Sequence, residues 1–182
     1  MEIFVVRHGQ TDYNVKHLFQ GYSDIPLNDI GMEQAKETAR KFENIRIDLI
    51  LVSPLKRALQ TAEYIKNVTK SQMIIEDRLI ERCFGNMEGH ENRKDWNIQM
   101  MLDYDKNYKK ENIEPIQEFF KRIYDFLEDI TEKYADKTIV LVTHGAVSQP
   151  IECYFKGMPD NRDFENFENL TLKNCEIRRY IV

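Results

Sequence analysis

The sequence predicts an α/β fold, a three-layer sandwich in which helices flank a mostly parallel central sheet. Three apolar runs, at residues 3–6, 47–52 and 138–142, lack a clean alternation of polar and apolar residues. Strands that are covered on both faces show this pattern. Helical patterns lie between the runs, and such an alternation of strands with helices is typical of a parallel sheet.

In the first half of the chain, two helices and one further strand are expected. The helix at 31–44 follows an Asn-Asp-Ile-Gly sequence that is typical of a turn. The helix at 54–68 is expected to begin at Pro54 with Ser53 as its N-cap, because serine before a helix and proline at its first position are strong start signals. A short strand follows at 72–75.

In the second half of the chain, the range 115–135 carries the clearest helical pattern, and another helix is expected after His144. The end of the chain, 175–182, is expected to form an edge strand. The segment 83–114 is rich in Asn, Lys, Glu and Tyr and predicts short helices and loops above the sheet, either as a solvated insertion or as a lid that shapes substrate choice. The apolar face of 115–135 is expected to be buried and consists of Ile116, Phe119, Phe120, Ile123, Phe126, Leu127 and Ile130.

The composition limits the class of protein. The 182 residues suit one domain, and the 42% of hydrophobic residues suffice for a core. A net charge of −5 argues against a nucleic-acid-binding surface, which would be strongly basic. No run approaches the ~20 apolar residues of a membrane helix, and the N-terminus lacks the apolar core of a signal peptide. We therefore expect neither a nucleic-acid nor a membrane partner.

The cysteines indicate a reducing compartment. Cys83, Cys153 and Cys175 are odd in number and widely spaced. This pattern predicts neither a disulfide framework nor a zinc cluster. A cytoplasmic protein is the simplest expectation.

Polar residues follow three of the predicted strands. Arg7 and His8 end the first strand, Arg57 lies in the first helical turn after the second, and His144 follows 138–142. In open α/β sheets, ligands bind beyond the carboxyl ends of the strands, so we expect these four side chains to converge on one crevice. Arginine binds phosphate oxygens in a bidentate manner, and helix N-termini favour anions. A phosphoryl group is therefore the predicted occupant.

Other chemistries fit this pattern less well. A metal ion would be repelled by Arg7 and Arg57, and the sequence has no His-Glu-x-x-His spacing, so we expect no metal and no cofactor. The sequence also lacks Gly-x-x-x-x-Gly-Lys and the Gly-x-Ser-x-Gly elbow of a serine hydrolase. Histidine can itself act as a nucleophile, and neighbouring arginine charges lower its pKa and keep the attacking nitrogen free of its proton.

Five segments resemble, in the same order, motifs of the histidine phosphatase superfamily, also called the phosphoglycerate mutase-like family. Together they span nearly the whole chain, which makes the resemblance far more specific than Arg-His-Gly alone. The segments are "VVRHGQTDYN" (5–14), "FQGYSDIPLNDIGMEQA" (19–35), "VSPLKRALQTAEYI" (52–65), "LIERCFGNMEG" (79–89) and "LVTHGAV" (141–147).

The resemblance implies a role for each matched residue. His8 would attack phosphorus and become a phosphohistidine. Glu81 would protonate the leaving alkoxide and later accept a proton from water, as one carboxyl can do in turn. Glu88 is the alternative carboxylate. The remaining residues would hold the phosphoryl group or line its pocket: Arg7, Arg57, His144, Asn14, Gln20, Gly21 and Gly145.

The resemblance leaves two enzyme activities open, because phosphatases and mutases of the family share the phosphohistidine. The chain is compact and its segment 81–96 is similar to the phosphatase branch, although Met87 stands where the family often has Trp. We therefore expect hydrolysis of phosphate monoesters. The alternative is a cofactor-dependent phosphoglycerate mutase, in which Arg82, Arg93 and Lys94 could bind a carboxylate or a second phosphate.

The third alternative belongs to another class, a catalytically inactive protein that binds phosphorylated ligands. The expected partner is a small phosphorylated metabolite. Sugar phosphates, phosphoglycerates, a nucleotide-loop phosphate of cobalamin synthesis and phosphoproteins all remain open as substrates. The segment 83–114 is expected to decide among them, within a single domain that spans 1–182. A homodimer through the C-terminal strand is a further possibility.

Overall fold

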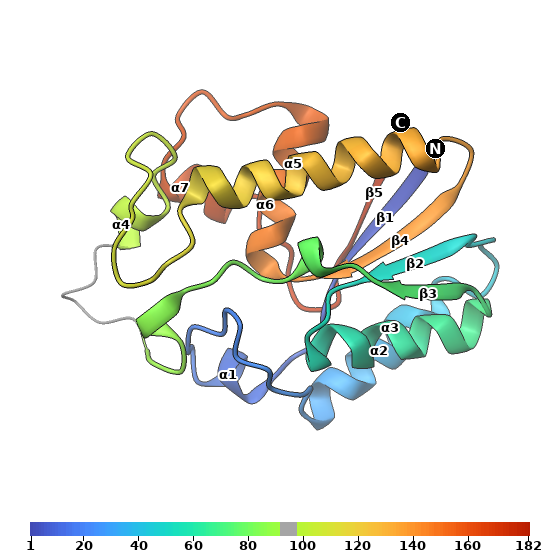
Figure 1. Cartoon of the computed structure of the whole chain (residues 1–182). Coiled ribbons are helices and arrows are strands. Elements are labelled where there is room, and N and C mark those ends of the chain that lie inside the picture. Colours follow the sequence, from blue (N-terminus) through green and yellow to red (C-terminus); the bar gives the residue numbers. More distant parts are fainter. Residues whose placement is uncertain (92–97) are drawn as a thin grey trace.

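The computed structural model describes residues 1–91 and 98–182, and its centre is a five-stranded sheet of order β3-β2-β4-β1-β5 (Figure 1). Neighbouring strands among the first four run parallel, and β5 pairs antiparallel with β1 at one edge. The predicted strands and the mostly parallel sheet are confirmed. The strands are β1 (Glu2–Arg7), β2 (Leu49–Val52), β3 (Gln72–Ile75), β4 (Thr138–Thr143) and β5 (Ile177–Ile181).

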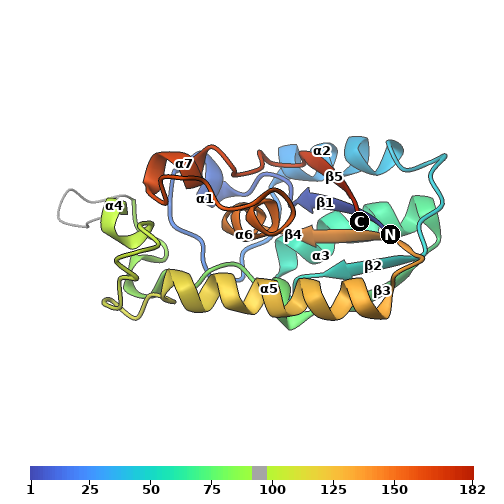
Figure 2. The same ribbon diagram turned by 90° about the horizontal axis from the view of Figure 1, so that it is seen from above.

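Helices cover both faces of the sheet, as Figure 2 shows from above. Helices α5 (Ile116–Lys133) and α6 (Gly145–Lys156) pack on one face. Helices α2 (Asp29–Arg40) and α3 (Lys56–Thr69) pack on the other. Successive strand residues point to opposite faces, so each central strand contributes to two apolar cores. This double cover explains the continuous apolar runs in the sequence.

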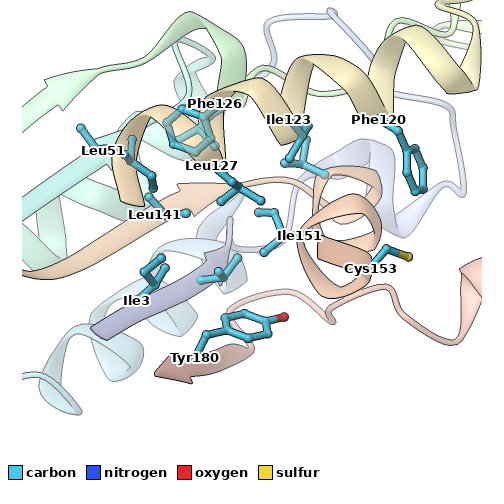
Figure 3. Packing of buried hydrophobic residues seen from close by; sticks show 14 of the residues in the cluster. Ile3, Leu51, Phe120, Ile123, Phe126, Leu127, Leu141, Ile151, Cys153 and Tyr180 are labelled. Atoms are coloured by element: carbon cyan, nitrogen blue, oxygen red, sulfur yellow. The ribbon is translucent and has the colours of Figure 1, made fainter. Parts of the chain in front are cut away.

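The larger core lies between the sheet and α5 (Figure 3). Leu51 and Leu141 from the sheet point toward Ile123, Phe126 and Leu127 of the helix in this view. Every residue of the predicted apolar face of α5 is buried. The helical spacing of apolar residues was therefore sufficient to identify the face that packs on the sheet.

Two helix starts differ from the sequence expectation. In α2, the side chain of Asn28 accepts a hydrogen bond from the backbone N–H of Gly31, so the Asn-Asp-Ile-Gly sequence is a cap and first turn. The predicted N-cap role of Ser53 is wrong. The helix α3 begins at Lys56, whose backbone N–H donates to Asp24 at 2.7 Å, while the Ser53 hydroxyl contacts the ring of His144.

Short elements gather beyond the end of the sheet at which β1, β2 and β4 terminate, while the two termini lie near each other at the other end (Figure 2). The described residues of the segment 83–114 form short helices and loops, as predicted, and pack around a small apolar cluster. Arg93 and Lys94 lie outside the described residues. The short helices are α1 (Asp12–Val15), α4 (Ile98–Met101), α7 (Phe164–Glu168) and the 3-10 turns Asp77–Leu79 and Gly85–Met87.

Within the described ranges, none of the helices combines the length and apolar character needed to cross a membrane.

Candidate active site

The structure brings four predicted side chains together at the ends of β1 and β4 and at the start of α3. We call Arg7, His8, Arg57 and His144 the cationic cup. The ring centroids of His8 and His144 are 5.2 Å apart, and Arg57 donates from Nε to Nδ1 of His144 at 3.2 Å. The charges of Arg7 and Arg57 both act on His8. The convergence follows from parallel strands that end at the same edge of the sheet.

His8 is held in a form suited to nucleophilic attack. Its Nδ1 lies 2.7 Å from the carbonyl oxygen of Gly9, which can only accept, so Nδ1 carries the proton and Nε2 is free of one. Burial, followed by the charges of Arg57 and Arg7, holds the pKa of His8 well below its usual value. The side chain is 1% exposed. At neutral pH the ring is therefore a neutral imidazole in one defined tautomer.

Arg57 is fixed through all three of its nitrogens. Besides its contact with His144, it donates from Nη1 to the carbonyl of Ser23 at 2.7 Å and from Nη2 to the carbonyl of Gly21 at 2.8 Å. Burial lowers its pKa to about 10, so it is still a cation at neutral pH. Each terminal nitrogen keeps a second N–H, and the guanidinium can offer these to an anion.

Glu88 fixes the loop that holds Arg57. One carboxylate oxygen accepts the backbone N–H of Tyr22 at 3.0 Å, and the other accepts the N–H of Ser23 at 2.9 Å and its hydroxyl at 3.2 Å. Gly21 has φ +46°, and a Cβ there would lie 2.0 Å from Glu88 Oε1. Glycine is thus required where the loop passes this carboxylate.

His144 has both ring nitrogens engaged inside the protein. Because Nδ1 accepts from Arg57, the proton is on Nε2, which donates to the Ser53 hydroxyl at 2.6 Å. Burial, followed by the charge of Arg57, holds the pKa of His144 well below its usual value. A direct contact from His144 to a phosphoryl oxygen would require exchange of the Ser53 bond. As placed, the ring orients Arg57.

Arg7 contains a buried donor that lacks a partner. Its Nη1 donates to the carbonyl of Leu172 at 2.6 Å, but Nε has no hydrogen-bond partner among the described residues. Leaving such a group unpaired costs about 1–3 kcal/mol. A Cβ on Gly145 would lie 3.1 Å from the guanidinium carbon, so glycine lets the first residue of α6 pack directly on Arg7. An anion bound at this point would supply the missing acceptor.

Glu81 is a buried carboxyl beside these cations. It is 7% exposed and accepts the backbone N–H groups of Arg82 at 3.0 Å and of Ala146 at 3.3 Å. Burial raises its pKa, although the charges of Arg57 and Arg7 oppose the shift. The protonated carboxylic acid is therefore favoured more than it would be in water.

Asn14 and Gln20 present amide N–H groups to the site. The Asn14 oxygen accepts the backbone N–H of Thr11 at 3.0 Å and the amide of Asn174 at 3.3 Å. The Gln20 oxygen accepts the hydroxyl of Thr11 at 3.1 Å. Since both oxygens are used inside the protein, the nitrogens are the groups that can contact a ligand. Asn14 and Gln20 can therefore each offer an amide N–H group to an anion.

A cavity of about 350 Å³ opens beside the cationic cup. Of the residues predicted to bind substrate, Arg7, Asn14, Gln20, Glu81 and Gly145 line it. His8, Arg57 and His144 are buried and, like Gly21, do not contribute to its lining. The other lining residues are Leu18, Phe19, Phe84, Ile98, Met101, Leu102, Ala146, Gln149, Glu168 and Thr171.

Arg82 does not lie where the sequence hypothesis placed it. It is 1% exposed and donates to the backbone carbonyls of Glu114 at 2.9 Å and Met101 at 3.0 Å. Arg82 does not line the cavity, so its position gives no support to the hypothesis that it binds a second anionic group there, although its Nη1 has no hydrogen-bond partner among the described residues. Its guanidinium instead fastens the segment 83–114 to the chain next to Glu81.

Three supporting residues were not identified from the sequence. Ser53 contacts His144, Thr61 accepts the backbone N–H of Gly9 at 3.1 Å, and Asn174 donates to the His8 carbonyl at 3.0 Å. Ser53 and Thr61 lie inside a segment that resembles the family, so that signal was present. Asn174 is far from every motif in the sequence, and only the fold places it here.

The described residues also bear on metal binding. Within 1–91 and 98–182, no group of three or more His, Cys, Asp and Glu side chains is arranged to hold a metal ion. The chemistry offered by the described side chains is that of cations, amide donors, a neutral imidazole and a carboxyl, all of which suit a phosphoryl group.

The chain is similar to known proteins over nearly its whole length. The family model described as "Histidine phosphatase superfamily (branch 1)" matches residues 3–181. The Hydrogenobacter thermophilus protein named "Putative phosphoserine phosphatase 2" is 33% identical over 183 residues, which cover 96% of this chain and 86% of that protein. "Phosphoglycerate mutase-like protein 4" of Arabidopsis thaliana is 31% identical over 179 residues, covering 94% and 77%.

Among solved structures, the phosphoserine phosphatase of Entamoeba histolytica in complex with 3-phosphoglyceric acid has a similar fold. The TM-score is 0.83 at 27% identity, and the match covers 99% of this chain and 90% of that one. The similarity therefore includes the sheet, both helical layers and the segments around the cavity.

Proposed function

The chain belongs to the histidine phosphatase superfamily, and from this premise we propose that it hydrolyses phosphate monoesters of small metabolites through a phosphohistidine on His8. Its phosphatase-named relatives identify it as an enzyme of the phosphatase class. The observation that carries the mechanism is the neutral His8 ring, whose Nδ1 is fixed on the Gly9 carbonyl beside two arginines. Such a ring can attack with Nε2 without first losing a proton.

In the first step, His8 Nε2 attacks phosphorus and the bond from phosphorus to the ester oxygen breaks. Glu81 gives its proton to that oxygen, so the alcohol leaves neutral and Glu81 becomes a carboxylate. Burial of Glu81 supports the proton-donating form. Arg7 and Arg57 stabilise the charge that develops on the phosphoryl oxygens, as preorganised cations do.

In the second step, a water molecule attacks the phosphohistidine. The Glu81 carboxylate accepts a proton from this water, and the bond between nitrogen and phosphorus breaks. Inorganic phosphate leaves, and His8 and Glu81 return to their starting protonation states. Amide donors from Asn14 and Gln20 support the phosphoryl group in both steps.

The contacts of the two candidate carboxylates support Glu81 over Glu88 as the acid. Glu88 accepts hydrogen bonds from the loop that carries Tyr22 and Ser23 and does not line the cavity. Glu81 lines the cavity and has a raised pKa. We assign Glu88 to positioning Arg57.

The segment 83–114 contributes to substrate choice within one domain that spans 1–182. Phe84, Ile98, Met101 and Leu102 come from this segment and line the cavity. This supports the interpretation of the segment as a specificity insertion rather than a solvated loop.

A phosphoglycerate mutase is the second candidate, favoured by the similarity to a mutase-like relative. Purified protein should release inorganic phosphate from several members of a phosphomonoester panel. Release from none of them would contradict the proposal. Isomerisation of phosphoglycerate in the presence of a bisphosphate primer, without net phosphate release, would establish the mutase instead.

A further inference from the structure

The cavity beside the cationic cup extends past the phosphoryl position. The part of its lining outside the cup and outside Glu81 must surround the alcohol that leaves. We call this part the leaving-group chamber. Asn14, Gln20, Gly145 and Ala146 also line the cavity and are counted with the phosphoryl site. The rest of the described lining consists of an apolar patch (Leu18, Phe19, Phe84, Ile98, Met101, Leu102) and a polar patch (Gln149, Glu168, Thr171).

The apolar patch is continuous with a small core. Phe19, Phe84 and Ile98 pack against the buried side chains of Met101 and Leu102. The rings of Phe19 and Phe84 are 5.2 Å apart. This surface can accept the carbon chain of an alcohol but offers it no polar contact.

The polar patch presents hydrogen-bond acceptors. Gln149 Nε2 donates to the Thr171 hydroxyl at 3.0 Å, which leaves the Gln149 oxygen as an acceptor beside the O–H of Thr171 and the second N–H of Gln149. The backbone N–H of Thr171 donates to the carbonyl of Glu168, so both belong to one turn at the end of α7. The Glu168 carboxylate makes no ion pair with a described residue.

Among the described residues of the chamber, Glu168 carries the one charge, and it is negative. Among the described residues that line the cavity, Arg7 is the one cation, and it belongs to the cup. Burial lowers the pKa of Arg7, and the Glu168 carboxylate is among the charges that oppose this shift, which places Glu168 within electrostatic reach of the cup. Arg7 and Glu168 line the same cavity, so a substrate with its phosphate on Arg7 occupies a space that Glu168 also lines.

We propose that the leaving-group chamber selects phosphate esters of short alcohols that carry an ammonium or another donor group, through Glu168 and Gln149, and disfavours esters that carry a carboxylate. The inference rests on the proposed phosphatase function and adds a substrate class to it. An ammonium group would pair with Glu168, whereas a carboxylate there would meet a like charge without a described cation to neutralise it.

The test compares two esters of similar size and opposite charge, phosphoethanolamine and phosphoglycolate. We expect kcat/KM of the wild type to be about tenfold higher for phosphoethanolamine, since the exposed carboxylate attracts the ammonium of one ester and repels the carboxylate of the other. Glu168→Gln should lower this ratio about fivefold, and Glu168→Lys should invert it. Glu165→Gln on the same helix is the matched control and should keep the ratio, because Glu165 does not line the cavity.

Both esters are assayed on one preparation, so the ratio does not depend on the folded fraction of a variant. Hydrolysis of nitrophenyl phosphate by the wild type would support the proposed function. If kcat/KM were then equal for the two esters, or their ratio were the same in wild type and Glu168→Gln, the inference alone would be overturned. If the wild type fails to hydrolyse nitrophenyl phosphate and both esters, the proposed function itself is wrong and the inference fails with it.

Discussion

The cationic cup and the leaving-group chamber lie next to each other but are built differently. In the cup, His8, Arg57 and His144 are almost fully buried, and their nitrogens contact backbone carbonyls, a serine and each other. The chamber is lined mostly by side chains from loops and short helices, with Gln149 from α6; most of these side chains are apolar, and Glu168 is an exposed carboxylate. We therefore propose that the strand ends determine the chemistry and that the segments around the chamber select the substrate.

This difference predicts that changes in the cup affect every substrate, whereas changes in the chamber affect ratios between substrates. The cup acts on the phosphoryl group, which all phosphomonoesters share. The chamber contacts only the alcohol, which differs from ester to ester. The following variants test this division in order of decreasing effect.

The largest effect is expected for His8→Ala, which removes the proposed nucleophile. Turnover should fall roughly 10⁴-fold or more on every ester, because loss of a nucleophile removes the covalent route. Phosphate release from a panel of esters measures this. His17→Asn, at an exposed histidine with φ +53°, is the matched control and should keep its activity. A loss confined to some esters would contradict the division between cup and chamber.

The next effect is expected for Glu81→Gln, which keeps the shape of the side chain but removes the proposed proton donor. Hydrolysis of alkyl phosphates should fall by roughly 10²–10⁴-fold, the usual contribution of general acid catalysis. Nitrophenyl phosphate should lose much less when the first step is measured by the burst of nitrophenol, since nitrophenolate leaves without a proton. Equal losses on both esters in that step would exclude Glu81 as the donor.

The pH dependence of the wild type and of Glu81→Gln is a further test of Glu81 as the proton donor. Burial raises the pKa of Glu81, so the protonated acid persists above the ordinary range of a carboxyl group. In the wild type, kcat/KM for an alkyl phosphate should decline as pH rises through this raised pKa. The decline should be absent in Glu81→Gln. A decline that persists in the variant would assign it to another group.

A smaller effect is expected for Glu88→Gln, which acts on the cup through Arg57. Weakening the hydrogen bonds to the loop at Tyr22 and Ser23 should lower kcat/KM about tenfold on all esters, as expected for loss of one or two hydrogen bonds to a charged group. The decisive control is a double-mutant cycle. In an Arg57→Ala background the same substitution should have little further effect, because the two residues act as one unit. Additive losses would indicate general destabilisation.

The smallest effect is the shift in substrate ratio expected for Glu168→Gln. It is about fivefold, three orders of magnitude below the effect of His8→Ala, because the carboxylate is exposed and water screens it. If a Glu168 variant lost turnover equally on all esters, Glu168 would act like a residue of the cup. This result would contradict the division between cup and chamber.

The sequence predicted the parts of the molecule that depend on local patterns. The strands and the buried face of α5 followed from the spacing of apolar residues, and the convergence of Arg7, His8, Arg57 and His144 follows from parallel strands. The cap role of Ser53 was wrong because α3 begins only at Lys56, and the Ser53 oxygen contacts His144 and the backbone N–H of Leu55 instead. Local propensity cannot anticipate the contact with His144.

Contacts between distant segments explain what the sequence did not reveal. Arg82 contacts the carbonyl of Glu114, 32 residues away, and Asn174 contacts His8 across 166 residues. The partners of such polar groups are set by the fold and leave no periodic signal. The proposed role of Glu88 in positioning Arg57 could not be predicted for the same reason, since it depends on the path of the loop near Gly21, which the fold determines.

The most direct test of the account is to trap the phosphoryl group on His8. Glu81→Gln should accumulate the intermediate from labelled nitrophenyl phosphate, because the ester needs no acid to leave while the attacking water lacks its base. We expect label that is lost in acid and kept in alkali, located by mass spectrometry on the peptide that contains His8. Label on another residue, or label that survives in a variant with His8→Ala, would contradict the central role of the cationic cup.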